Sequence, residues 1–121
     1  RRIKMANKIS RDTKARSTAD YFTLSFSASA NSTAADLVGR FPIAIENVAS
    51  GPTSVTIDVL GADGTTYKAL HDSAGTVVTL TLVASKYSEL PDSVCKACMG
   101  RTIRLVNGGS ITKDVYLYVG S

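Results

Sequence analysis

The stretch SVTIDVLGADGTTYKALH, residues 54–71, decides the fold class. Its first seven residues alternate between aliphatic and polar side chains, a pattern typical of a half-buried β-strand. Asp63-Gly64 tolerates the positive φ that a tight hairpin turn requires, so residues 66–71 are expected to pair back across the turn. The stretch therefore predicts an antiparallel β-hairpin.

The same period-two pattern continues on both sides of this hairpin. Further strands are expected at residues 21–27, 41–48, 76–84, 101–106 and 114–119. Residues 28–36 and 107–110 are small and polar, so they are expected to form loops. The strand at 76–84 is apolar on both faces, which predicts that it is the longest strand and lies centrally.

One segment departs from this pattern. Leu90-Pro91-Asp92-Ser93 is typical of a helix start, and Gly100 is typical of a helix end, so a short helical turn is expected between them. About seven strands joined by short turns, with no long helix, predict an all-β fold. We expect an antiparallel, jelly-roll-like β-sandwich, because a single flat sheet would leave one apolar face in water.

The chain is long enough for one self-sufficient domain. A chain of 121 residues buries about two thirds of its unfolded surface, so its core needs no metal or disulfide. The longest apolar run is far shorter than the ~18 residues of a membrane helix, so the chain is not expected to be an integral membrane protein. No apolar segment follows the basic start, so no signal peptide is expected. We divide the chain into an extended basic arm, residues 1–20, and a β-sandwich domain, residues 21–121.

The positive charge is concentrated in the arm. Residues 1–16 hold seven basic groups and one acid, a net charge of +6, whereas residues 17–121 carry a net charge of −2. Such an arm favours an acidic partner: a protein, nucleic acid or a membrane surface. Of these we rank a protein first and nucleic acid second, and we expect no membrane partner. Fully extended, twenty residues reach roughly 70 Å, enough to cross a neighbouring subunit. The residues expected to bind the partner are Arg1, Arg2, Ile3, Lys4, Lys8, Ile9, Arg11, Lys14 and Arg16.

Few residues carry the types and spacing that catalysis or metal binding requires. His71 is the only histidine, and it is expected to lie at a strand end beside a turn. Cys95 and Cys98 form a lone C-x-x-C, whereas a structural zinc site needs four ligands, so two reduced thiols are expected. We therefore expect no catalytic residue, no cofactor and no metal, and a protein that is not an enzyme.

Tyr116 and Tyr118 lie two residues apart on the last predicted strand and therefore share a face. Two interpretations are open. The pair forms a stacking platform for sugars or bases, or it packs against neighbouring strands or another subunit.

The stretch from Ser54 to Val119 resembles small β-sandwich proteins of tailed-phage virions. The motifs that carry the resemblance are SVTI at 54–57, GADGTTY at 61–67, DSAGT at 72–76, ELP at 89–91 and GRTIRLV at 100–106. The resemblance implies a structural virion protein, such as a capsid decoration (cement) protein, and no catalytic residues. It also implies a homotrimer that binds the major capsid protein, assembled in the host cytoplasm and located in the virion.

Three functions follow as hypotheses. The first is a decoration protein whose β-sandwich and basic arm bind and stabilise the phage head lattice. The second is a small viral coat protein whose arm binds nucleic acid with strong salt dependence. The third is a carbohydrate-binding module built on Tyr116 and Tyr118, against which the lack of tryptophan counts.

Overall fold

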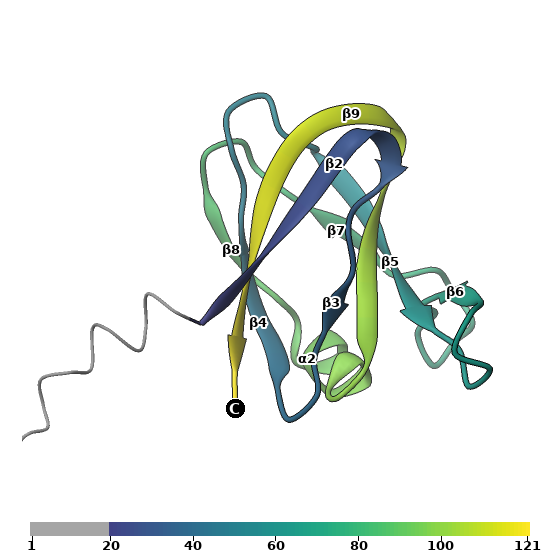
Figure 1. Cartoon of the computed structure of the whole chain (residues 1–121). Helices are drawn as coiled ribbons and strands as arrows, with labels where there is room; N and C mark the ends of the chain where they lie inside the picture. The colour runs from purple at the N-terminus through teal and green to yellow at the C-terminus, as the bar shows by residue number, and fades with distance from the viewer. Residues whose placement is uncertain (1–19) are drawn as a thin grey trace, which may run out of the picture.

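The computed structural model describes residues 20–121, so the predicted arm contacts of residues 1–16 lie outside the described part of the chain. The described chain forms eight strands and one short helix, and the all-β antiparallel prediction is confirmed (Figure 1). In chain order the elements are β2 (Tyr21–Asn31), β3 (Ala35–Asp36), β4 (Phe41–Glu46), β5 (Ser54–Leu60), β6 (Tyr67–Ala69), β7 (Thr79–Thr81), β8 (Tyr87–Glu89), α2 (Asp92–Cys98) and β9 (Thr102–Gly120).

All eight strands belong to one sheet that is organised around β9. The first half of β9 pairs with β5 and β3, and the second half pairs with β4 and β2. Strands β6 and β7 extend the sheet beyond β5, and β8 extends it beyond β4. Figure 1 shows β9 and β2 arching together over the top of the molecule, so the sheet curls into two layers that resemble a sandwich.

The arch coincides with irregular pairing between β2 and β9. The register shifts between Ser27 and Ser29 and again between Ser29 and Asn31, and Ala28 has a positive φ of 55°. Such β-bulges bend a strand and increase its twist. Across the same interval β9 runs from Ile111 back to Val106, so the intervening residues of β9 form the outside of the bend.

Three details of the predicted strands are wrong. Within the segment 76–84 only Thr79–Thr81 forms a strand, on the edge of the sheet, and Val77 makes one isolated bridge to His71. Val77 and Val83 are 40% and 54% exposed. The longest strand is instead β9, which joins the two strands predicted at 101–106 and 114–119 through the predicted loop at 107–110. The predicted loop at 28–36 instead contains the end of β2 and the whole of β3, both of which pair with β9. Hydrogen bonds to the neighbouring strand outweigh the low β-propensity of these small residues.

The local predictions around the hairpin and the helix are confirmed. Strand β5 has the predicted bounds, and β6 pairs back across the turn, in which Gly64 has a φ of 75°. Helix α2 follows Pro91, and the chain leaves it through Gly100, which has a φ of 73°. Glycine adopts this left-handed conformation without steric cost, which explains its position after the helix.

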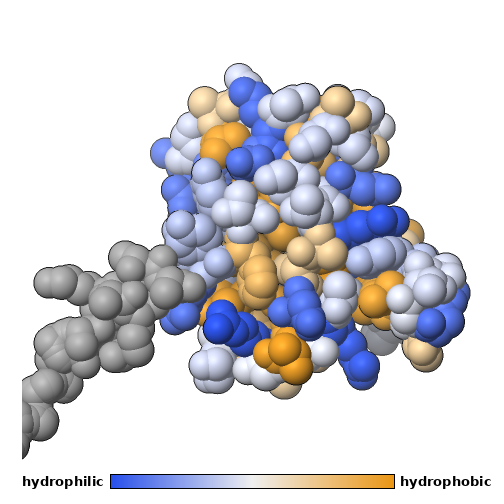
Figure 2. Space-filling view, in the orientation of Figure 1, coloured by the Kyte–Doolittle hydropathy of each residue, from blue (hydrophilic) through white to orange (hydrophobic). Residues whose placement is uncertain are grey.

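The core lies between the two layers and is closed at one end by α2. Figure 2 shows hydrophobic residues in the middle of the visible face, with hydrophilic residues around them. The buried aliphatic and aromatic side chains come from both layers and from the helix. Those that are almost fully buried include Leu24, Phe26, Leu37, Ile45, Val55, Ile57, Val94, Ile103, Leu105, Val115 and Leu117.

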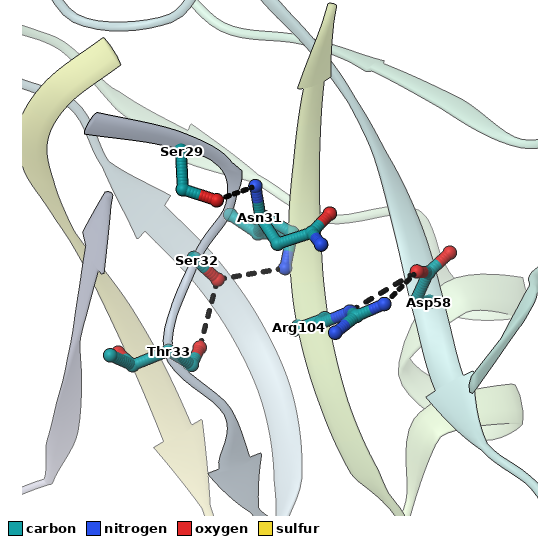
Figure 3. A network of polar contacts seen from close by, with 7 residues as sticks. Ser29, Asn31, Ser32, Thr33, Asp58 and Arg104 are labelled. Atoms are coloured by element: carbon teal, nitrogen blue, oxygen red, sulfur yellow. Dashed lines mark hydrogen bonds and ion pairs between the residues drawn. The ribbon is translucent and has the colours of Figure 1, made fainter. Parts of the chain in front are cut away.

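A buried serine holds the segment between β2 and β3 against β9. The backbone N–H of Leu105 donates to Ser32 Oγ at 2.9 Å, and the N–H of Ser32 donates to the Leu105 carbonyl at 2.9 Å. The Ser32 hydroxyl in turn donates to the carbonyl of Thr33 at 2.8 Å (Figure 3). This side chain therefore satisfies polar groups that lie beside the core.

Thr33 occupies the outer edge of β2. Its backbone N–H donates to the carbonyl of Ser25 at 3.0 Å, and its Oγ1 accepts the Ser25 N–H at 3.0 Å. A single residue thereby pairs both backbone groups that Ser25 presents on the side away from β9.

We expect Ser32→Ala to lower the free energy of unfolding by about 1–3 kcal/mol, because it leaves the buried Leu105 N–H without its side-chain acceptor. Urea denaturation followed by circular dichroism measures the loss. Ser29→Ala is the matched control: Ser29 Oγ accepts only the exposed Asn31 N–H, so its cost is expected to stay within about 0.5 kcal/mol. Equal losses in the two variants would contradict the anchoring role of Ser32.

Candidate functional site

Four tyrosines gather on the outer surface of the layer formed by β8, β4, β9 and β2. Val115, Leu117 and Val119 are buried, so the alternating Tyr116 and Tyr118 point outward. The strand register places Tyr21 opposite Tyr118, and places both Tyr87 and Tyr116 opposite Glu46. We call this set the tyrosine face; its residues are Tyr21, Glu46, Tyr87, Tyr116 and Tyr118.

The tyrosine rings contact one another mainly edge to face. Tyr21 and Tyr116 have ring centroids 5.7 Å apart and an interplanar angle of 86°, and Tyr87 and Tyr118 are 5.1 Å apart at 69°. Tyr21 also lies 5.4 Å from Tyr118 at 41°. Edge-to-face pairs are favourable because the positive ring edge meets the negative ring face. This geometry favours the cross-strand packing interpretation over a flat stacking platform, although Tyr87 and Tyr21 remain 59% and 41% exposed.

A carboxylate fixes the centre of the tyrosine face. The Tyr118 hydroxyl donates to Glu46 Oε1 at 2.7 Å, from β9 to the adjacent β4. This hydrogen bond, with a smaller effect of burial, raises the pKa of Tyr118 from 10.0 to about 12. The bond holds the Tyr118 ring in one orientation, and the rings of Tyr21 and Tyr87 pack against it.

The tyrosine face is also acidic at its rim. Glu89 lies two residues after Tyr87 on β8, and Asp114 lies two residues before Tyr116 on β9, so strand alternation puts both carboxylates on the same side as the rings. Both residues are exposed. The surface therefore combines exposed aromatic rings with three carboxylates, a combination that suits a cationic partner.

The outer surface of the other layer carries a closely related group. Arg104 donates from Nε and Nη2 to Asp58 Oδ2 at 3.2 and 3.1 Å (Figure 3), and its Cζ lies 4.0 Å from the centroid of the Tyr67 ring. The side chains of Arg104 and Asp58 are 26% and 17% exposed. Here the carboxylate, the cation and the aromatic ring are all supplied by β5, β6 and β9, and together they join these three strands.

A hollow of about 370 Å³ lies between the β6–β7 turn and α2, and His71 lines it. His71 Nδ1 is 2.9 Å from the Ala69 carbonyl, and Asp72 accepts the N–H groups of Ala74 and Thr76. Both side chains thus serve the strand end and the turn, which is where the sequence placed His71.

The two cysteines lie one turn apart on α2, and both are free thiols. Burial raises the pKa of Cys98 to about 11, and burial together with Asp92 raises the pKa of Cys95. Raised values disfavour the thiolate, which is the reactive and metal-binding form. Within residues 20–121, no group of three or more His, Cys, Asp or Glu side chains is arranged to hold a metal.

Asp63 stabilises the β5–β6 hairpin turn. Its Oδ1 accepts the backbone N–H groups of Thr65 and Thr66 at 3.0 and 2.9 Å. These hydrogen bonds lower the pKa of Asp63 to about 2.

Sequence reasoning identified Tyr116 and Tyr118 as a pair but missed Tyr21, Glu46 and Tyr87. These residues come from three other strands, and only the strand register brings them together.

In the described part of the chain no helix is long and apolar enough to span a membrane. Comparisons with protein-family models, with curated proteins and with solved structures found no match for this chain.

We expect one of the five tyrosines to titrate near pH 12 in the wild type, and Glu46→Gln to return that pKa toward 10. Absorbance of tyrosinate measures both values. Because the folded-state pKa is raised, this contribution to stability is complete below about pH 10 and is lost as the pH rises to about 12. Tyr118→Phe should remove that loss, and an unchanged titration in Glu46→Gln would contradict the bond's role.

Proposed function

We propose that this protein is a structural protein of a virus particle, a capsid decoration protein that binds a coat lattice through the tyrosine face and the basic arm. The observation that carries the proposal is the position of Tyr21. This residue belongs to the tyrosine face and directly follows the last residue of the arm, Asp20, in the sequence. A partner that contacts the arm or the face is within reach of the other.

The tyrosine face has the composition of a protein-binding surface. Tyrosine is enriched in protein interfaces because its ring offers a large contact area and its hydroxyl offers a hydrogen bond, with few rotatable bonds to order. In this protein the rings are already ordered by each other and by Glu46. Little conformational entropy therefore remains to be lost when a partner binds.

The opposite charges of the arm and the body support a two-part attachment. Residues 1–16 of the arm, with a net charge of +6, would be drawn to acidic patches on a capsid surface, and Ile3 and Ile9 would dock there. The tyrosine face would contact a second, basic or neutral patch. On a repeating lattice two modest contacts for each copy combine through effective concentration, and a trimer would multiply them further.

The alternative of a nucleic-acid-binding coat protein places all binding on the arm. The carboxylates of Glu46, Glu89 and Asp114 would repel phosphates from the tyrosine face. Binding of nucleic acid by the arm at physiological salt, with no attachment to capsids, would favour this alternative. A glycan bound in a Tyr116-dependent manner would favour a carbohydrate-binding module.

The test mixes the purified full-length protein with mature phage heads that lack decoration proteins and measures bound copies after sedimentation. We expect saturable binding. Tyr87→Ala should weaken it about tenfold, the size of an interface hot spot. Replacing the seven basic arm residues by glutamine should weaken binding further and reduce its salt dependence.

Tyr67→Ala is the matched control for the aromatic change, because Tyr67 lies on the other layer, under Arg104. Its binding should equal that of the wild type. Absence of saturable binding to heads, or equal losses in Tyr87→Ala and Tyr67→Ala, would refute the proposal.

A further inference from the structure

Each outer surface of the curled sheet carries a carboxylate beside a tyrosine ring, and the two surfaces differ in what that carboxylate binds. On one layer the Asp58 carboxylate and the Tyr67 ring hold the Arg104 guanidinium between them. On the other layer the Glu46 carboxylate lies among tyrosine rings, and its hydrogen bond is to Tyr118. The Arg104–Asp58 pair is the single ion pair within residues 20–121, so no described lysine or arginine fills the corresponding place.

The segment that precedes the described chain is rich in cationic side chains. Residues 1–16 carry seven arginine and lysine side chains, and only three residues, 17–19, separate Arg16 from Asp20. The backbone of Asp20 is itself joined to β9, next to Tyr118, since its carbonyl accepts the Val119 N–H at 3.1 Å. At about 3.3–3.6 Å per residue, the four residues from Arg16 to Asp20 span at most about 14 Å, and neighbouring strands are about 4.8 Å apart. The basic side chains are therefore tethered within reach of the tyrosine face.

We propose that the tyrosine face binds the basic segment of its own chain, residues 1–16. An arginine or lysine side chain of that segment lies against the exposed rings of Tyr21 and Tyr87, with its charge beside the Glu46 carboxylate. Glu89 and Asp114 attract further basic groups along the rim. A short tether gives the segment a millimolar effective concentration, so the same chain outcompetes a second copy at ordinary protein concentrations.

This contact makes the free protein occupy its own binding surface. Any partner of the tyrosine face has to displace the basic segment, and displacement leaves seven positive groups available to that partner. Docking at the face and release of the arm are then linked events. The inference concerns the isolated protein and does not rest on the proposed function.

The test uses the full-length protein, uniformly labelled with carbon-13 and nitrogen-15, in low salt. We expect nuclear Overhauser effects between tyrosine ring protons and the side-chain methylene protons of arginine or lysine residues in the segment 1–16. They should persist on tenfold dilution and weaken as salt is added, because a tethered ion contact depends on screening and not on protein concentration.

Three variants locate the contact. Replacing the seven basic arm residues by glutamine should abolish these effects, and Glu46→Gln should reduce them at least severalfold. Asp36→Asn makes the same charge change on β3, in the other layer, and should leave them at the wild-type level.

The inference is overturned if the wild type shows no such effects in low salt, or if Glu46→Gln and Asp36→Asn behave alike. Mixing labelled with unlabelled chains provides a further check. Effects that occur only between different chains would assign the contact to a second copy and overturn the intramolecular contact. Failure of the protein to bind phage heads would leave all of these outcomes unaffected.

Discussion

The pairing of β9 along both of its edges is the constraint on which the rest of the structure depends. One strand of 19 residues belongs to both layers, so the layers cannot separate without breaking its ladders. Its alternation puts Ile103 and Leu105 into the core from one layer, and Val115 and Leu117 from the other. The same alternation turns Arg104 outward on one side and Tyr118 outward on the other. The core and both polar surfaces are therefore consequences of a single strand.

Local pattern was sufficient for elements whose partners lie nearby in sequence. The β5–β6 hairpin and α2 were predicted because the turn residues Asp63-Gly64 and the terminal Gly100 act within a few residues. Non-local pairing defeated the same reasoning at 76–84, where alternating valines and leucines favoured a central strand. There Leu80 and Leu82 are buried, but Val77 and Val83 are exposed, because the segment forms a strand of only three residues at the edge of the sheet. At residues 107–110 the opposite occurred: their composition predicts a loop, but the pairing of the flanking residues makes them part of the arch of β9.

The candidate site was predictable only in part, for the same physical reason. That Tyr116 and Tyr118 share a face follows from strand alternation alone. That they meet Tyr21, Glu46 and Tyr87 depends on the register of three antiparallel ladders, which a one-residue slip would change completely. The predicted binding residues of the arm lie outside the described chain, and the virion function stays a hypothesis. The charge asymmetry between the arm and the body can be read from the sequence. Only the structure shows that carboxylates of the body lie on the tyrosine face.

The position of Thr33 beside β2 has a consequence for how copies behave when crowded. The strand Tyr21–Asn31 has no charged residue and no proline, and an open edge of that kind invites the same strand of another molecule to continue the sheet. Thr33 interrupts the row of free backbone groups at Ser25, near the middle of the straight part of the strand. A neighbouring chain meets an edge that is already occupied there and finds no long template to follow. The cap at Ser25 therefore disfavours edge-to-edge pairing between copies at high local concentration.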